Sequence, residues 1–309
     1  MTSPISRVTM EVTNAMKTNR LIALLLLIII LTSIFSTCLA DVLMPQEGNK
    51  TKKSGMLTID YSNCSEGYVM VKAKPTAKTL KLRVVHNNMD IHYDLNSDGK
   101  YEVFPLQDGN GKYVFTLYEK GKSNSYKQLN TINITVDMPD PNRCFLYPNQ
   151  YINYTPETPA VIFAQELCKG MTDPEDIALT IYNYIAWDES QFETWIDETG
   201  QQQTMLVERI EFSKLGIRDS LPEIDKTFAT NKGVCKDVSG LMVAMLRSVG
   251  IPTKYIVGKA HNEEHAWIAI IINNSEIEID PQDRIWDPKL KLNDLRIHEE
   301  LGYTIKRWY

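Results

Sequence analysis

The chain has 309 residues, of which 43% are hydrophobic and 23% charged, and its formal net charge at pH 7 is -6. This length is sufficient for two ordinary domains, each with its own core. The acidic balance, and the lack of any basic face in the sequence, argue against nucleic acid as a partner.

The first forty residues have the composition of an export segment. An uncharged stretch, LIALLLLIIILTSIFSTCLA, covers residues 21–40, and Lys17 and Arg20 stand before it. This order predicts a secretory signal peptide, and the stretch is also nearly long enough to remain as a membrane anchor. Either reading places the chain from Asp41 onward outside the cell or at its surface. A third interpretation makes Cys38 a lipid-carrying cysteine.

Four cysteines follow the leader, at Cys64, Cys144, Cys168 and Cys235. Outside the cell, paired cysteines usually form disulfides. The two bridges considered are Cys64–Cys144 and Cys144–Cys168, while Cys235 is expected to stay free. The spacings contain no metal-binding pattern of the CxxC type, so no metal is predicted.

Residues 41–150 are predicted to form an all-β domain. Between Met56 and Val136, about seven short segments with alternating hydrophobicity read as strands, and turn sequences such as HNN and DGNG separate them. This density of short strands is typical of an immunoglobulin-like, antiparallel β-sandwich. Such modules more often bind or position a partner than catalyse a reaction.

The sequence DLNSDG, at residues 94–99, opens like a calcium-binding loop. That loop needs a bidentate glutamate at its twelfth position, where this chain has Pro105. The preferred interpretation is a hairpin turn between two strands, and no cofactor is predicted.

Residues 151–309 are predicted to form a second domain of α+β type. After a join rich in proline and tyrosine, the hydrophobic period becomes helical. Thr158-Pro159 and Asp173-Pro174 each combine an N-cap residue with a first-turn proline and therefore mark helix starts. Residues 188–217 are polar and are predicted to form a long loop or lid over a site.

The segment NKGVCKDVSGLMVAMLRSVGIP predicts a helix from about Cys235 to Ser248, ended by Gly250 and Pro252. Its apolar residues cover every side, so the helix is expected to be buried. Cys235 would stand at the N-terminal end, where free backbone N–H groups and the helix dipole favour a thiolate. Asp237, in the first turn, is expected to cap the helix rather than to act in chemistry.

Thirty residues further on, EEHAWIAIII, NNS and EIEIDP predict a β-hairpin. His265 starts its first strand and Asp280 ends its second. Antiparallel pairing across residues 273–275 places Asp280 beside residues 267–268, diagonal to His265. Each residue alone is more often structural than catalytic. Together with Cys235, however, they supply the thiolate, imidazole and orienting carboxylate of a cysteine nucleophile.

These blocks resemble the transglutaminase-like superfamily: GVCKDVSGLMVAMLRSVGIPTKYIVG, then HAWIAI, then IEIDP. The resemblance implies a papain-like core in which Cys235 is the nucleophile, His265 the general base and acid, and Asp280 the orienting carboxylate. The lead-in SLPEIDKTFATNKGVC and, less specifically, FLYPNQYINY resemble secreted bacterial members.

The sequence departs from the family pattern around the aspartate. Members often have a tryptophan two or three residues before it, where this chain has Ile277 and Glu278. Trp286 is a candidate replacement for that ring. Asp283 and Asp287 are alternative orienting carboxylates.

The leading hypothesis is an exported enzyme whose thiol attacks an amide bond of a peptide or a cell-surface protein. An amine (transglutaminase) or water (peptidase or amidase) would then release the acyl group. The alternative is a non-catalytic surface module that binds a peptide or wall ligand and retains the triad as a relic. A third interpretation assigns a structural surface function to the β-sandwich.

Overall fold

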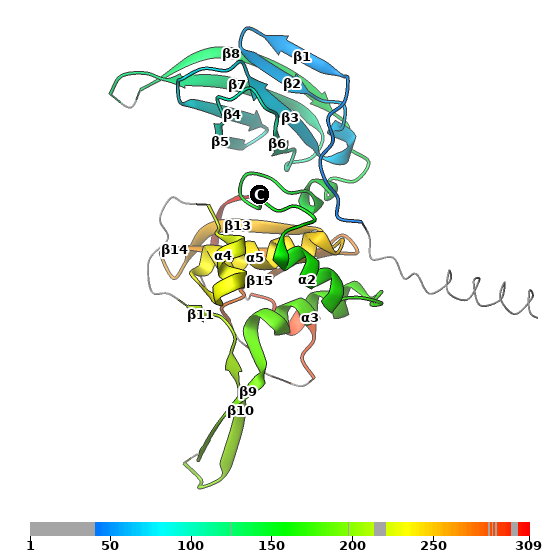
Figure 1. Cartoon of the computed structure of the whole chain (residues 1–309), viewed down its shortest axis with the longest axis vertical. Helices are drawn as coiled ribbons and strands as arrows, with labels where there is room; N and C mark the ends of the chain where they lie inside the picture. The colour runs from blue at the N-terminus through cyan, green and yellow to red at the C-terminus, as the bar shows by residue number, and fades with distance from the viewer. Residues whose placement is uncertain are drawn as a thin grey trace, which may run out of the picture. The chain divides into compact units, whose positions relative to one another are not determined.

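The computed structural model describes residues 41–123, 125–196, 198–212, 221–283, 285, 287, 289–297 and 302–309 (Figure 1). Residues from Ala40 to Tyr309 form one compact unit. The predicted leader, with Cys38, lies outside the described residues. Among the residues that are described, no helix combines the length and the apolar character needed to cross a membrane.

Residues 51–136 form two four-stranded antiparallel sheets, with strand orders β1-β2-β3-β6 and β5-β4-β7-β8. A short 3-10 helix, η1, covers Cys64–Glu66. The strands are β1 (Thr51–Ser54), β2 (Leu57–Asp60), β3 (Tyr68–Ala73), β4 (Leu80–His86), β5 (Met89–Leu95), β6 (Glu102–Pro105), β7 (Gly111–Lys120) and β8 (Tyr126–Val136).

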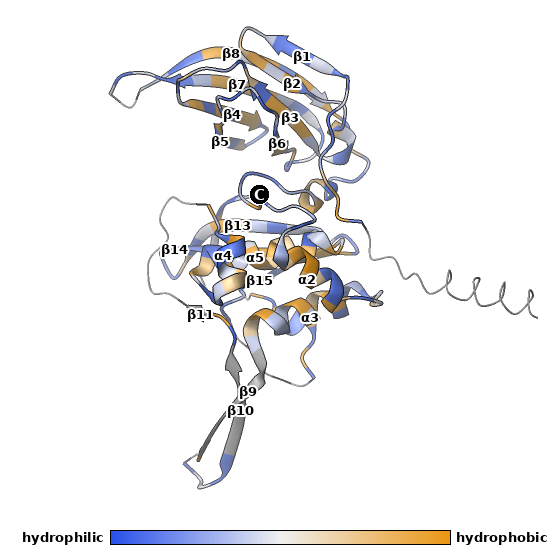
Figure 2. Cartoon of the chain, viewed as in Figure 1, coloured by the Kyte–Doolittle hydropathy of each residue, from blue (hydrophilic) through white to orange (hydrophobic). Residues whose placement is uncertain are grey.

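Alternation of apolar and polar residues explains these strands. Every second residue of β4 and of the C-terminal half of β8 is buried, and Figure 2 shows the matching change of hydropathy along β8. All seven predicted strands are confirmed. The additional strand β1 has the sequence TKKS, which is mostly exposed and carries no hydrophobic signal. The immunoglobulin-like arrangement of the two sheets stays a prediction.

The predicted hairpin turn at residues 94–99 is wrong. Strand β5 belongs to one sheet and β6 to the other, so the connection between them crosses from sheet to sheet. Within it, the Asp98 carboxylate accepts a hydrogen bond from the backbone N–H of Lys100 at 2.9 Å. A turn signal in a sequence marks a change of direction, but it does not say which sheet receives the next strand.

The join between the two regions is partly buried. It contains a 3-10 helix, η2 (Arg143–Leu146), whose Cys144 and Phe145 pack with Ile271 and Trp308. Cys64, Cys144, Cys168 and Cys235 are all free thiols, so neither considered disulfide is present. Burial raises the pKa of Cys144 to about 12, so that thiol packs as an apolar group.

In its described residues, the C-terminal region combines four α-helices with an antiparallel sheet in the order β15-β14-β13-β16. The predicted helix starts at Thr158 and Asp173 are confirmed, and the Asp173 side chain caps its helix. The elements are α2 (Pro159–Leu167), α3 (Pro174–Ala186), α4 (Ile224–Thr230), α5 (Cys235–Ser248), β13 (Thr253–Ala260), β14 (Glu263–Ile272), β15 (Ser275–Ile279), η3 (Leu292–Leu295) and β16 (Thr304–Trp308).

The polar segment predicted as a loop or lid is mostly a β-hairpin. Strands β9 (Trp187–Ile196) and β10 (Gln202–Glu208) pair antiparallel and extend as a narrow ribbon in Figure 1. A further short strand, β11 (Glu211–Phe212), pairs in parallel with β12 (Lys232–Gly233). Backbone hydrogen bonds between the two strands form whatever the side chains are. The sequence of this segment has no alternation of apolar and polar residues, so it did not predict strands. Residues 213–220 lie outside the described part.

Candidate active site

Helix α5 places Cys235 at its first position. All fourteen of its residues are buried, and the apolar run from Leu241 to Leu246 covers every side of the helix, as predicted. The Asp237 carboxylate accepts hydrogen bonds from the backbone N–H groups of Val234 and Glu223, each at 3.1 Å, and from the Lys236 ammonium at 2.8 Å. Asp237 is therefore engaged in capping, as predicted. Cys235 is the first residue of the helix and is 8% exposed.

The hairpin of β14 and β15 brings His265 and Asp280 together. Its register pairs Ile268 with Ile279, so Asp280 follows the last paired residue of β15. His265 Nε2 lies 2.6 Å from Asp280 Oδ2, and the Asp280 side chain is almost fully buried. The register predicted from the sequence placed Asp280 diagonally to His265, and the slant of the strands brings the two side chains into contact.

His265 contacts Cys235 as well as Asp280. Burial by itself lowers the pKa of the imidazole, but hydrogen bonds with Asp280 and Cys235 outweigh it and raise that pKa to about 10. The imidazole therefore holds its proton at neutral pH, between a carboxylate and a sulfur. The three predicted residues form one connected site.

The Asp280 carboxylate has two further partners. The Tyr303 hydroxyl donates to Oδ2 at 2.7 Å, and the backbone N–H of Gln282 donates to Oδ1 at 2.9 Å. Burial and the neighbouring carboxylate raise the pKa of Tyr303, so it remains a donor. Tyr303 has no signal in the sequence, because it stands 23 residues beyond Asp280, which belongs to the last block that resembles a known motif.

An aromatic group lies next to the imidazole. The Trp267 and Tyr303 rings meet edge to face at 5.1 Å between centroids, and the His265 ring lies 6.2 Å from Trp267. Trp267 Nε1 donates to the Glu278 carboxylate at 2.8 Å. Glu278, at a position where the family often has tryptophan, thus holds a tryptophan of the neighbouring strand. Trp286 lies outside the described residues.

The alternative carboxylates do not bond to the imidazole. The backbone N–H of Asp283 donates to the Asp280 carbonyl at 3.0 Å, while burial and the charge of Asp280 raise the pKa of the Asp283 carboxyl. Asp287 accepts from the backbone N–H of Lys289 at 2.8 Å. Within the described ranges, no cluster of three or more histidine, cysteine, aspartate or glutamate residues could hold a metal ion.

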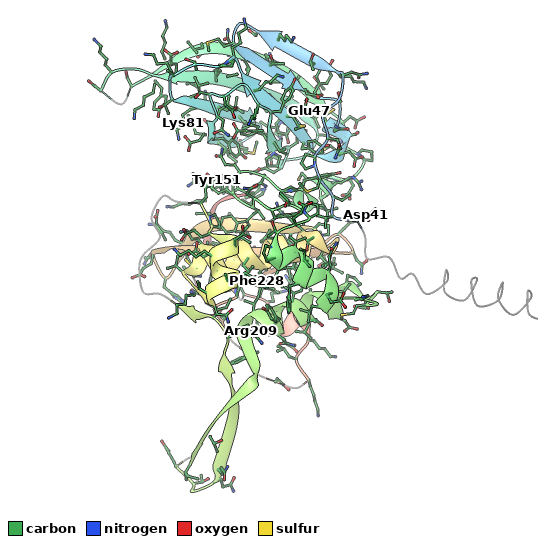
Figure 3. The ribbon with its side chains drawn as sticks, viewed as in Figure 1. Asp41, Glu47, Lys81, Tyr151, Arg209 and Phe228 are labelled. Carbon is green, nitrogen blue, oxygen red and sulfur yellow. The ribbon has the colours of Figure 1, made fainter. Side chains whose placement is uncertain are left out.

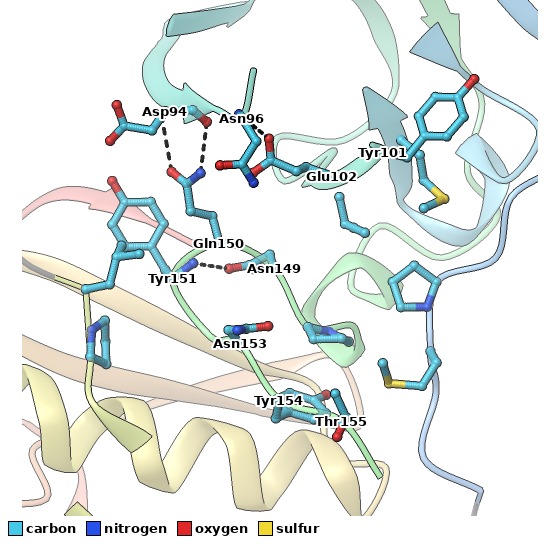
Figure 4. A pocket seen from close by; sticks show the side chains of 17 residues that line it. Asp94, Asn96, Tyr101, Glu102, Asn149, Gln150, Tyr151, Asn153, Tyr154 and Thr155 are labelled. Atoms are coloured by element: carbon cyan, nitrogen blue, oxygen red, sulfur yellow. Dashed lines mark hydrogen bonds between the residues drawn. The ribbon is translucent and has the colours of Figure 1, made fainter. Parts of the chain in front are cut away.

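A cavity of about 280 Å³ adjoins the site. Its lining includes Lys236, which follows Cys235, and Glu264 and Ala266, which flank His265. It shares Gln150 and Tyr151 with a larger cavity of about 690 Å³, shown in Figure 4.

Gln150 is fixed where the two cavities meet. Its amide accepts from the backbone N–H of Asp94 at 3.2 Å and donates to the carbonyl of the same residue at 2.8 Å. The two cavities are therefore neighbours on either side of Gln150 and Tyr151.

Residues 162–281 match the family model described as Transglutaminase-like superfamily. The chain therefore carries a transglutaminase-like domain over these residues, built mainly of strands with few helices, and the resemblance is confirmed. Cys235, His265 and Asp280 all fall inside the matched range.

No curated protein matches the chain. Among solved structures, it is similar to a candidate cysteine protease from Cytophaga hutchinsonii, with 16% identity over 71% of this chain and 80% of that one and a TM-score of 0.37. A candidate protease from Parabacteroides distasonis shares 12% identity over 66% and 38% of the two chains (TM-score 0.30). The transglutaminase of red sea bream shares 11% over 72% and 49% (TM-score 0.27).

Proposed function

We propose that this protein is an exported cysteine acyl-transfer enzyme that acts on amide bonds of peptides or cell-surface proteins. Cys235 is the nucleophile, His265 the general acid and base, and Asp280 the orienting carboxylate. The observation that carries the proposal is the placement of the His265 imidazole between the Cys235 side chain and the Asp280 carboxylate.

The first half-reaction forms a thioester. The Cys235 sulfur, having given its proton to His265, attacks the amide carbonyl carbon. The carbonyl oxygen becomes an oxyanion, for which the backbone N–H of Cys235 at the start of α5 is a donor. His265 then gives its proton to the leaving nitrogen, the C–N bond breaks, and an amine departs.

The second half-reaction releases the acyl group. Neutral His265 takes a proton from an incoming amine or water, which attacks the thioester carbonyl. The C–S bond breaks, and either a new amide or a carboxylic acid leaves the site. Asp280, held by Tyr303 and Gln282, keeps the imidazole in one orientation through both halves.

An activated ester tests this function without knowledge of the natural substrate. A p-nitrophenyl ester of a short N-acyl amino acid should give a burst of p-nitrophenol equal to the enzyme concentration, with the acyl group on Cys235 by mass spectrometry. Added hydroxylamine should divert the acyl group to a hydroxamate if amines reach the thioester.

Two variants make the result specific. Cys235→Ala should abolish the burst, and Cys64→Ser, a matched loss of a half-buried thiol, should leave it unchanged. Equal release by the parent protein and Cys235→Ala would overturn the enzyme function and favour the surface-binding alternative.

Export and the packing of the two front sheets as an immunoglobulin-like sandwich are parts of the same proposal. The leader composition supports export, and the two four-stranded antiparallel sheets support the sandwich. Fractionation of expressing cells should place the protein outside the inner membrane or in the medium. Recovery only from the cytosol would overturn the export part.

A further inference from the structure

The cavity of about 690 Å³ in Figure 4 does not belong to the candidate active site. Its lining includes neither Cys235 nor His265 nor Asp280. Most of its lining comes from two segments, the connection that crosses from β5 to β6 and residues 148–155 of the join. Small-molecule sites typically measure about 300–1,000 Å³, so the cavity has room for a ligand that the proposed acyl transfer does not use.

The two segments hold each other in place. At one end of the cavity, the Gln150 amide bonds to the backbone N–H and carbonyl of Asp94. The Asn149 side-chain oxygen accepts from the backbone N–H of Tyr151 at 2.9 Å. The centre of the Tyr151 ring, labelled in Figure 3, lies 3.5 Å from the centre of the Tyr309 ring. The walls are therefore ordered before a ligand arrives, which lowers the entropy cost of binding.

Three polar side chains of the wall are free to bond to a ligand. Asn96 and Asn153 are exposed, and the half-buried Tyr101 has the Lys72 ammonium 3.9 Å from its ring centre. Within the described part of the chain, no group hydrogen-bonds to their side-chain amide or hydroxyl atoms. An asparagine amide presents a donor and an acceptor side by side, and a phenol hydroxyl serves as either. A ligand with adjacent hydroxyl groups matches such amides.

The charges around the cavity favour an uncharged ligand. Among the described residues that line it, none is a lysine, arginine or histidine, so an anion finds no cation there. Asp94 already pairs with Lys81 at 2.6 Å. Glu102 accepts from the backbone N–H of Asn96 at 2.5 Å, and burial raises the pKa of its carboxyl, which disfavours the charged form. A cation therefore gains little from either carboxylate.

One side of the cavity is apolar. Met70 belongs to a hydrophobic cluster against which Val103 and Tyr101 pack, and all three residues line the cavity. In Figure 4, Tyr101 lies on the opposite side of the cavity from Gln150. A sugar ring has the same two-sided character, because its faces carry C–H groups and its rim carries hydroxyls, each of which donates one hydrogen bond and accepts two. The lining therefore matches a sugar better than a wholly polar or a wholly apolar molecule.

We propose that this cavity binds a neutral oligosaccharide. Adjacent hydroxyls of the sugar bond to Asn96 and Asn153, and a ring face lies against Met70 and Val103. The inference goes beyond the proposed acyl transfer and does not depend on it, because the cavity is separate from Cys235. Plain hexoses and N-acetylated hexosamines share this chemistry, and matched probes separate them.

Isothermal titration calorimetry with neutral trisaccharides tests this site in the purified full-length protein. The panel contains cellotriose, maltotriose, mannotriose and the N-acetylated chitotriose. At least one of them should bind with a Kd below about 1 mM. Binding of chitotriose alone assigns an N-acetylated sugar, and binding of any other member assigns plain hydroxyls. Trigalacturonate and spermidine are the anionic and cationic controls. Failure of every neutral probe to bind, or tighter binding of either control, would overturn the inference.

Four single variants and one double variant locate the site. Asn96→Ala and Asn153→Ala each remove an exposed amide and should weaken the binding about threefold to tenfold, without changing the midpoint of urea unfolding. Asn88→Ala removes an exposed asparagine outside this cavity and should leave the affinity unchanged. Cys235→Ala should bind the sugar as the parent does although it loses the burst, which separates failure of this inference from failure of the proposed function. Equal affinity of the parent protein and the double variant Asn96→Ala/Asn153→Ala would show that the sugar does not bind in this cavity.

Discussion

The His265 imidazole is the residue on which the site depends. It lies between the carboxylate of Asp280 and the sulfur of Cys235, and both partners favour its charged form against the effect of burial. The proposed acyl transfer requires such a proton, because the leaving amine must be protonated as the C–N bond breaks.

This protonation makes the stability that His265 contributes depend on pH. Its pKa is about 10 in the folded protein and 6.5 in an unfolded chain. A raised pKa of a base stabilises the folded state in full below about pH 6.5, and that contribution is lost as the pH rises toward 10. The unfolding free-energy difference between the parent protein and His265→Ala should therefore shrink from pH 6 to pH 10.

Urea unfolding at pH 6, 8 and 10 measures this difference. A His265→Ala difference that is flat, or that grows with pH, would show that the imidazole is not held in its charged form.

Loss of the Asp280 charge should slow acylation without unfolding the protein. Asp280→Asn keeps the volume but weakens the orientation and charge of the imidazole, so the burst rate should fall by about 10²- to 10⁴-fold. Tyr303→Phe removes one hydrogen bond to the same carboxylate and should lower the burst rate by about tenfold or less.

Asp283→Asn is the control for this assignment and should change the burst rate little. A larger effect at Asp283 than at Asp280 would mean that the wrong carboxylate was assigned.

At the level of the secondary structure, the last strand supports the hairpin that carries His265 and Asp280. Strand β16 pairs with β13, which pairs with β14, and Tyr303 immediately before β16 reaches back to Asp280. The pairing of β13 with β16 has an irregularity between Val257 and Gly258. There the two backbones approach closely.

Gly258→Ala should therefore disturb the site from outside it. A methyl group at Gly258 would overlap the Thr304 carbonyl oxygen and come within 2.5 Å of the Trp267 ring. Relief of this overlap moves β16, so the free energy of unfolding should fall by about 1–3 kcal/mol and the burst should slow. Gly109→Ala is the control, since nothing lies within 4 Å of the added carbon and only its positive φ opposes the change. Equal effects of both variants would show that the close approach is unimportant.

The elements that the sequence predicted are those with a strong hydrophobic period or a clear cap. Helix α5 and strands β4 and β14 are of this kind. The elements that it missed, such as β1 and β16, are mostly exposed, and neighbouring strands rather than their own pattern hold them in place. Hydrophobic period reports burial, so strands with little burial give no signal.

At the scale of the whole molecule, one buried arginine links distant parts of the chain. The Arg247 guanidinium donates to the carbonyls of Tyr147 at 2.9 Å, Thr253 at 2.7 and 2.9 Å, and Tyr309 at 2.7 Å. These carbonyls belong to the join, the start of β13 and the C-terminal residue. Burial lowers the pKa of Arg247 to about 10.

Arg247→Met should destabilise the whole unit. It fills most of the volume but leaves three carbonyl oxygens without their donors, so the free energy of unfolding should fall by about 3 kcal/mol or more. Arg83→Met, which removes the exposed pair with Asp90, should cost about 1 kcal/mol or less. Urea titration followed by tryptophan fluorescence measures both, and similar losses would contradict the linking role of Arg247.

The sequence predicted the three residues of the site because they stand within recognisable local patterns: a helix start and the two ends of a hairpin. Tyr303 has no such pattern. Its position follows from the return of the C-terminal strand beside β13, which is a long-range pairing that local sequence does not encode. The join also depends on a long-range contact. Its Tyr147 carbonyl accepts a hydrogen bond from Arg247, which lies one hundred residues further along the chain.

The most direct test of the central claim is the rate at which iodoacetamide alkylates Cys235 in the parent protein, His265→Ala and Asp280→Asn. Peptide mapping reports Cys64, Cys144 and Cys168 in the same samples as internal references. We expect Cys235 to react fastest in the parent protein, to lose most of this advantage in His265→Ala, and to lose part of it in Asp280→Asn. Equal Cys235 rates in all three proteins would contradict it, and would make Cys235 a packing residue of α5.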